Sequence, residues 1–124
     1  MIGTLMMRVS AVILCVGMVA GIAMGIAEDF RLASAHAHLN LIGGVLLFIC
    51  GLFYNLNPRA GRSRLAFTQG MLHIVAAIIF PVGIGAVMLF GHALVVLPIV
   101  GSFAVIGAML LFAVVVFKST AGAT

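Results

Sequence analysis

The sequence predicts an all-α integral membrane protein in which four transmembrane helices form an up-down bundle. Of its 124 residues, 65% are hydrophobic and only 6% are charged, whereas a soluble domain is about half apolar and a quarter charged. The apolar segments are continuous and long enough to cross a hydrocarbon core of roughly 30 Å, which takes about 20 helical residues. Backbone groups in lipid must be satisfied internally, so the spans are helices or a closed barrel. The absence of strict alternation excludes the barrel.

Four apolar segments divide the chain, which we interpret as a single domain covering residues 1–124. The predicted spans are residues 5–27, 30–54, 65–90 and 94–117. The connections are short, so neighbouring spans are expected to be antiparallel and adjacent. The first segment is longer than the apolar region of a usual signal peptide, and no clean A-x-A site precedes Glu28. We therefore interpret it as a membrane helix.

Basic residues are concentrated on one side of the predicted membrane. That side holds Arg8, Arg59, Arg62, Arg64 and Lys118, and the other holds Glu28, Asp29 and Arg31. The positive-inside rule places both termini and the arginine-containing loop in the cytoplasm. The formal net charge of +4 is thus a topology signal and does not predict nucleic-acid binding. The expected location is the inner membrane of a bacterium, with the lipid bilayer as the first partner.

Small residues recur along the first span, where Gly17, Gly21 and Gly25 are four residues apart. Such a stripe lets another helix approach closely. It can also admit a flat ligand such as a macrocycle, but ordinary helix contact is the favoured interpretation. Pro81 lies in the middle of the third span and predicts a kink there.

The four histidines, His36, His38, His73 and His92, are the residues most able to carry chemistry. An ionisable side chain inside a membrane span is a functional hypothesis by default. The chain has only two acidic residues, and neither lies within a span core. Relays of paired carboxylates and sites for hard cations are therefore excluded. Imidazole remains as a ligand for haem iron, copper or zinc.

His36 and His38 are two residues apart near the start of the second span. A helix advances about 100° per residue, so their side chains diverge by about 200° and cannot bind the same ion or haem. Each serves a different partner, or one is functional and the other structural. If both are ligands, two sites flank this helix. A ring of subunits would supply one site at each interface.

The two other histidines, and two polar residues near His36 and His38, also have predicted roles. His73 is either a ligand or a hydrogen-bond donor to a carbonyl of a neighbouring helix. His92 lies in the outer loop, where a solvated role is favoured over a ligand role. Asn40 lies about one turn below His36 and is expected to hydrogen-bond a ligand or an imidazole. Arg31 is expected to meet anionic groups such as haem propionates.

At the other end of the second span, Tyr54 and Asn55 are predicted to act as an interfacial anchor. The two cysteines, Cys15 and Cys50, lie inside spans at unrelated depths. They are interpreted as small apolar residues of helix packing, without a disulfide or a metal site.

The segment HAHLNLIGG, which contains His36, His38 and Asn40, resembles the histidine-bearing helix of the haem-copper oxidase and nitric oxide reductase superfamily. The whole chain is similar to small four-span bacterial membrane proteins described as oxidase subunit I-like. The matching pieces are HAHLNLIGG, GLFYNLNP, LH in the third span and the closing GSFAVIGAMLLFAVVVF. The similarity covers about residues 30–118, and HAHLN is its specific part.

In the large oxidases the catalytic subunit has twelve helices in three arcs of four. The second helix of the first and third arcs carries haem ligands, including a His-x-His pair that serves two haems. The resemblance implies that this chain corresponds to one arc and that a homotrimer rebuilds the twelve-helix ring. Haem b would then lie between adjacent subunits, ligated by His36 of one and His38 of the next.

The chain also departs from that family. The oxidase copper site needs three histidines, and the crosslinked tyrosine and the proton channels have no counterpart here. His73 falls on the helix that carries copper ligands in the family, but one histidine does not make a copper centre.

The leading expectation is a haem b protein for electron transfer or for gas or redox sensing, with an unknown redox partner. One alternative is a minimal oxidase or reductase with an open haem position near His73. Another is a cofactor-free structural or assembly subunit. Copper and zinc stay open as alternatives to haem. Whether the protein is an enzyme is left open.

Overall fold

The computed structural model describes residues 1–121, and these fold into four long apolar helical segments. Each is long and apolar enough to cross a membrane. The segments are Ile2–Ala27, Ala33–Leu56, Arg64–Phe90 and His92–Ser119. They confirm the prediction of four long apolar helices and extend the first and last by a few residues.

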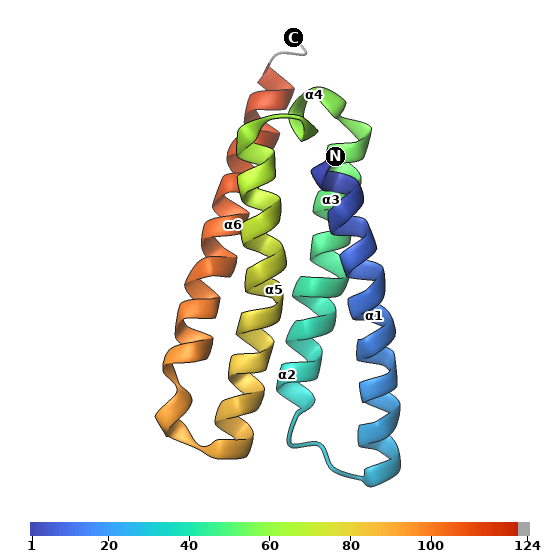
Figure 1. Cartoon of the computed structure of the whole chain (residues 1–124), viewed down its shortest axis with the longest axis vertical. Helices are drawn as coiled ribbons and strands as arrows, with labels where there is room; N and C mark the ends of the chain where they lie inside the picture. The colour runs from blue at the N-terminus through green and yellow to red at the C-terminus, as the bar shows by residue number, and fades with distance from the viewer. Residues whose placement is uncertain (122–124) are drawn as a thin grey trace.

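The four segments run up and down in chain order (Figure 1). Helix α1 (Ile2–Ala27) packs along the second span, and α5 (Arg64–Phe90) packs on the other side of that span. Helix α6 (Val96–Ala121) packs chiefly against α5. Helix α5 is continuous through Pro81, which is buried.

The second span is built from three helical pieces rather than one uniform α-helix. It begins as α2 (Ala33–His38), continues as a π-helix, η1 (Leu39–Leu46), and ends as α3 (Leu47–Leu56). The span therefore starts three residues later than expected and ends two residues later. The π-helix is a departure from the regular helix that the hydropathy predicts, and π-turns inside helices are frequent at functional sites.

Side chains from both neighbouring helices bond to carbonyls of η1. The Ser10 hydroxyl of α1 donates to the Gly44 carbonyl. The Nε2 atom of His73, on α5, lies 3.2 Å from the Ile42 carbonyl oxygen. These two carbonyls share the Leu47 amide, and within a bilayer no water is available to complete their hydrogen bonding. Ser10 and His73 therefore stabilise the π-helical turn and tie α1 and α5 to the second span.

Tyr54 is fully buried in the main apolar cluster, with Met6, Leu47 and Cys50 beside it in that cluster. Its hydroxyl donates a hydrogen bond of 3.0 Å to Gln69 Oε1 on α5. The prediction of an interfacial anchor is therefore wrong for Tyr54. The reason is that Gln69 gives the phenol a partner inside the bundle, so the ring does not need the membrane surface.

Asn55, the other predicted anchor, is half-buried between the second span and α1. Its Oδ1 accepts a hydrogen bond of 3.3 Å from the Thr4 hydroxyl. Its amide thus joins two helices. The cysteines form no disulfide: Cys15 is exposed and Cys50 is buried, and both are free.

The loop between the second and third spans contains the short helix α4 (Pro58–Gly61). Ser63 follows it and caps α5, because its hydroxyl oxygen accepts from the Ala66 amide at 3.1 Å. Serine is a preferred residue at this position, which explains why α5 begins at Arg64. The single turn η2 (His92–Leu94) joins α5 to α6.

Two glycines make the contact between α5 and α6 close. A Cβ atom on Gly83 would lie 2.6 Å from the backbone nitrogen of Pro98, and one on Gly101 would lie 2.6 Å from the Cα atom of Phe80. Both distances are to main-chain atoms, which cannot move aside as a flexible side chain can. The packing of α6 therefore depends on these glycines.

We predict that Gly101→Ala lowers the stability of the bundle by about 1–3 kcal/mol, the usual cost of adding a methyl group to a filled contact. Gly107→Ala, on the same helix, is the matched control. A Cβ there would lie 3.7 Å from Leu72 Cδ2, an ordinary contact. Thermal unfolding of both variants in detergent tests this. Equal midpoints for the two variants would show that α6 does not rely on the close approach.

Candidate cofactor site beside His36

His36 lies between the second span and α1. A Cβ atom on Gly21 of α1 would lie 3.1 Å from His36 Cε1 and 3.4 Å from His36 Nε2. A Cβ on Gly17, one turn away, would overlap the side-chain amide of Asn40. The predicted helix contact along the glycine stripe is therefore present at these two positions. Its partners are the polar side chains of the second span.

Asn40 holds the imidazole of His36 in place. Its Nδ2 donates to the His36 carbonyl oxygen at 2.8 Å and lies 3.3 Å from His36 Nδ1. The expected contact between Asn40 and an imidazole is thus present. An amide NH₂ group can only donate, so Nδ1 accepts in this arrangement and the ring proton is on Nε2.

His38 has the opposite tautomer. Its Nδ1 lies 2.7 Å from the Ser34 carbonyl oxygen. A carbonyl can only accept, so Nδ1 carries the proton and Nε2 has a free lone pair. Histidines that ligate metals usually donate their other ring N–H in this way, which fixes the ring and raises the basicity of the ligating nitrogen. His38 therefore has the protonation state that a ligand requires.

The two histidines contact different helices. His36 faces Gly21 on α1, whereas the His38 ring meets Phe80 of α5 edge-on, with 5.1 Å between ring centroids and 78° between ring planes. This agrees with the divergence expected for residues two apart. Within residues 1–121 no three side chains of His, Cys, Asp or Glu come together as a metal site. Within one chain, His36 is thus directed toward α1 and His38 toward α5.

An apolar cavity of about 540 Å³ lies beside His36, between α1, α2 and α5. Its walls include Met24 of α1, Leu39 of the second span, and Pro81, Gly85 and Phe90 of α5. Among the described residues that line it, His36 alone has a side chain with nitrogen or oxygen. The volume is within the range of small-molecule and cofactor sites, about 300–1,000 Å³.

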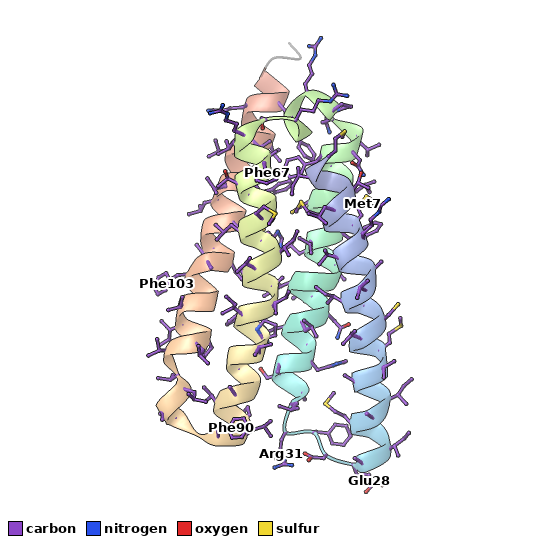
Figure 2. The ribbon with its side chains drawn as sticks, in the orientation of Figure 1. Met7, Glu28, Arg31, Phe67, Phe90 and Phe103 are labelled. Carbon is purple, nitrogen blue, oxygen red and sulfur yellow. The ribbon has the colours of Figure 1, made fainter. Side chains whose placement is uncertain are left out.

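A smaller cavity of about 230 Å³ adjoins the first one toward the loop that joins α1 and α2. It shares Met24 and Leu32 with the first cavity and adds Asp29 and Arg31. Figure 2 shows Arg31 and Glu28 at this end of the bundle. The loop end of the apolar space therefore holds both a cation and a carboxylate.

Arg31 is bound to Asp29 in the structure. Its Nη2 atom lies 2.6 Å from Asp29 Oδ2, and its Nε atom lies 3.0 Å from both carboxylate oxygens. This hydrogen bonding lowers the pKa of Asp29 to about 2 and raises the pKa of Arg31. An anionic ligand at the entrance would share the guanidinium with this carboxylate.

His73 is buried and belongs to a hydrogen-bond network separate from the residues around His36. Its Nδ1 lies 3.4 Å from Gln69 Nε2, and Gln69 Oε1 accepts from the Tyr54 hydroxyl. With Nε2 at the Ile42 carbonyl, both ring nitrogens have partners. Of the two alternatives for His73, the structure shows the hydrogen bond between helices. Gln69 and His73 are four residues apart, which places them one helical turn from each other.

His92 is exposed in the turn between α5 and α6, in keeping with the loop position predicted for it. It does not line the cavity beside His36. No protein-family model, no curated protein and no solved structure matches this chain. The resemblance to the haem-copper oxidases therefore stays a prediction.

We predict that His73→Ala destabilises the bundle by about 1–2 kcal/mol, because it removes the bond to the Ile42 carbonyl across helices and leaves the NH₂ group of Gln69 without its His73 partner in lipid. His92→Ala removes an imidazole from an exposed position and should leave the unfolding midpoint unchanged. Denaturant unfolding of the two variants in detergent measures the difference. If both variants unfold at the wild-type midpoint, the network does not stabilise the π-helical turn.

The ion pair in the loop makes a prediction about pH. Asp29 should titrate at about 2, and Arg31→Gln should return its pKa toward the ordinary 3.8. The native pKa is the lower one, so the pair contributes stability above pH 3.8 and loses it as the pH falls through about 2. Carbon-13 NMR of the Asp29 carboxyl group follows the titration. A pKa near 3.8 in the unaltered chain would contradict the pairing.

Proposed function

We propose that this chain is an integral membrane haem b protein with histidine ligands, which acts in electron transfer or in redox or gas sensing. The observation that carries the proposal is the apolar cavity of about 540 Å³ with the imidazole of His36 on its wall. Imidazole is a common axial ligand of haem iron. Apolar walls suit the macrocycle, and a propionate group at the loop end would share the Arg31 guanidinium with Asp29.

The residues around His36 fit such a ligand after one local change. Binding of iron through Nε2 requires the ring proton to be on Nδ1. Asn40 would then have to present its oxygen to Nδ1 in place of the NH₂ group that now lies 3.3 Å away. Rotation of the amide achieves this without moving the backbone. It gives up the bond from Asn40 to the His36 carbonyl.

His38 supplies the second half of the proposed ligand set. It already has a free lone pair on Nε2, because Nδ1 donates to Ser34. It contacts α5, whereas His36 contacts α1. We therefore infer that His36 of one chain and His38 of a second copy ligate the same haem. A homotrimer resembling the twelve-helix ring of the oxidases would repeat this contact three times.

A bound haem would supply reversible one-electron exchange, and the protein would set its position and surroundings. With His36 and His38 both holding the haem, small gases would bind poorly, which favours electron transfer over gas sensing. The apolar walls would keep water away from the macrocycle. The basic end of the bundle would face the cytoplasm of a bacterium by the positive-inside rule. The site would then lie nearer the outer face of the inner membrane.

We predict that His36→Ala and His38→Ala each remove the haem, because each chain gives one ligand to each of two sites. His92→Ala is the control and should keep it. Optical spectra of the purified protein, oxidised and dithionite-reduced, give the haem-to-chain ratio, and sharp reduced α and β bands indicate bis-histidine ligation. Full haem in either single variant would overturn the shared site.

Two other results would favour the alternatives. Binding of carbon monoxide to the reduced protein would indicate an open haem position and thus a minimal oxidase or reductase. Absence of a Soret band from protein that is fully inserted in the membrane would favour a structural subunit. In that case the imidazole of His36 would serve, like that of His73, to join helices.

A further inference from the structure

The end of the bundle opposite to His36 has a larger cavity, of about 670 Å³. It lies where the second span ends in α4 and where α5 begins, beside the last turns of α6. Figure 1 shows α4 and the end of α6 at the same end of the molecule as the N-terminus. The cavity is far from the proposed haem site, and no sequence motif pointed to it.

Its lining combines two cations with an apolar floor. Arg59 of α4 and Lys118 of α6 come from segments far apart in the sequence, and both line the same space. The apolar part includes Leu56, Leu65 and Val115, and Val115 belongs to the buried cluster of the bundle. The space is thus amphipathic, with positive charge beside hydrocarbon.

No side-chain carboxylate of this chain neutralises these cations. The sequence has two acidic residues, Glu28 and Asp29. Figure 2 labels Glu28 at the other end of the four spans, and Asp29, the next residue, is bound to Arg31 there. The hydroxyls at this end are used locally, since Ser63 donates to the Ala60 carbonyl and Ser119 to the Val116 carbonyl. Arg59 and Lys118 are both exposed, so an anion from outside the chain can reach them.

The position of the cavity in the fold indicates which kind of anion would bind there. It lies where membrane-spanning helices end, at the level of lipid headgroups, with leucine and valine side chains continuing into the apolar bundle. Basic pockets between transmembrane helices on the cytoplasmic side bind the headgroups of acidic lipids. A water-soluble phosphate would leave the apolar part of the lining without a partner.

We propose that this cavity binds one acidic phospholipid, with its phosphate between Arg59 and Lys118 and the start of an acyl chain against Leu56 and Val115. Bound there, the lipid would bridge α4 and α6. Helix α6 packs chiefly against α5, so the lipid adds a second attachment at its cytoplasmic end. The proposal does not depend on haem.

The test is native mass spectrometry of the full chain in detergent. Phosphatidylglycerol and phosphatidylcholine with identical acyl chains are offered at equal concentration. The unaltered chain should retain one phosphatidylglycerol in preference to phosphatidylcholine. The double variant Arg59→Gln with Lys118→Gln should lose this preference, by roughly fivefold for each cation removed.

The matched control is Arg8→Gln with Arg62→Gln. It removes the same charge from the same end of the bundle, at exposed residues that do not line the cavity, and should keep the preference. Equal loss in both double variants would mean that general charge attracts the lipid, and would overturn the site. Equal retention of the two lipids by the unaltered chain would do the same. Displacement of the lipid by equimolar inorganic phosphate would assign the cations to a soluble anion and also overturn the proposal.

Discussion

The structure depends on how the backbone of η1 (Leu39–Leu46) is satisfied inside an apolar bundle. In this π-helix the Leu47 amide is shared between the Ile42 and Gly44 carbonyls, and lipid offers these carbonyls no water. Ser10 from one side and His73 from the other each add a bond to one of the two carbonyls. Three of the four spans are thereby joined at one level. The π-helix begins directly after His38. The bonds from Ser10 and His73 therefore also hold in place the segment that follows α2, the helix that carries His36 and His38.

The sequence predicts the number and extent of the spans because the thickness of the bilayer sets the length of each apolar segment. It does not predict the π-helix, since hydropathy carries no information on the register of backbone hydrogen bonds. It also misplaces Tyr54. An aromatic residue at a span end usually sits at the membrane surface. Here Gln69, fifteen positions later, accepts its hydroxyl proton inside the bundle, and that partner is defined only by the packing of α5.

The candidate site is likewise predictable from the sequence in its local geometry but not in its cavity. The divergence of His36 and His38 follows from helical geometry alone, because both lie in the regular α2 before the π-helix begins. The contact of Asn40 with His36 follows from their spacing of four. The cavity does not follow from local sequence. Its far wall includes Pro81 and Gly85 of α5, and their distance from His36 is set by the packing of whole helices.

The three histidines within the spans differ in a way that bears on function. A neutral imidazole has one donor and one acceptor, and a purely structural histidine in lipid needs partners for both. His73 meets this requirement, with the Ile42 carbonyl on one nitrogen and Gln69 on the other. His38 donates to Ser34 through Nδ1, but its Nε2 accepts no hydrogen bond from the described residues. Packing alone therefore accounts for His73 but not for the lone pair of His38, which the proposed haem iron, shared with a neighbouring chain, would use.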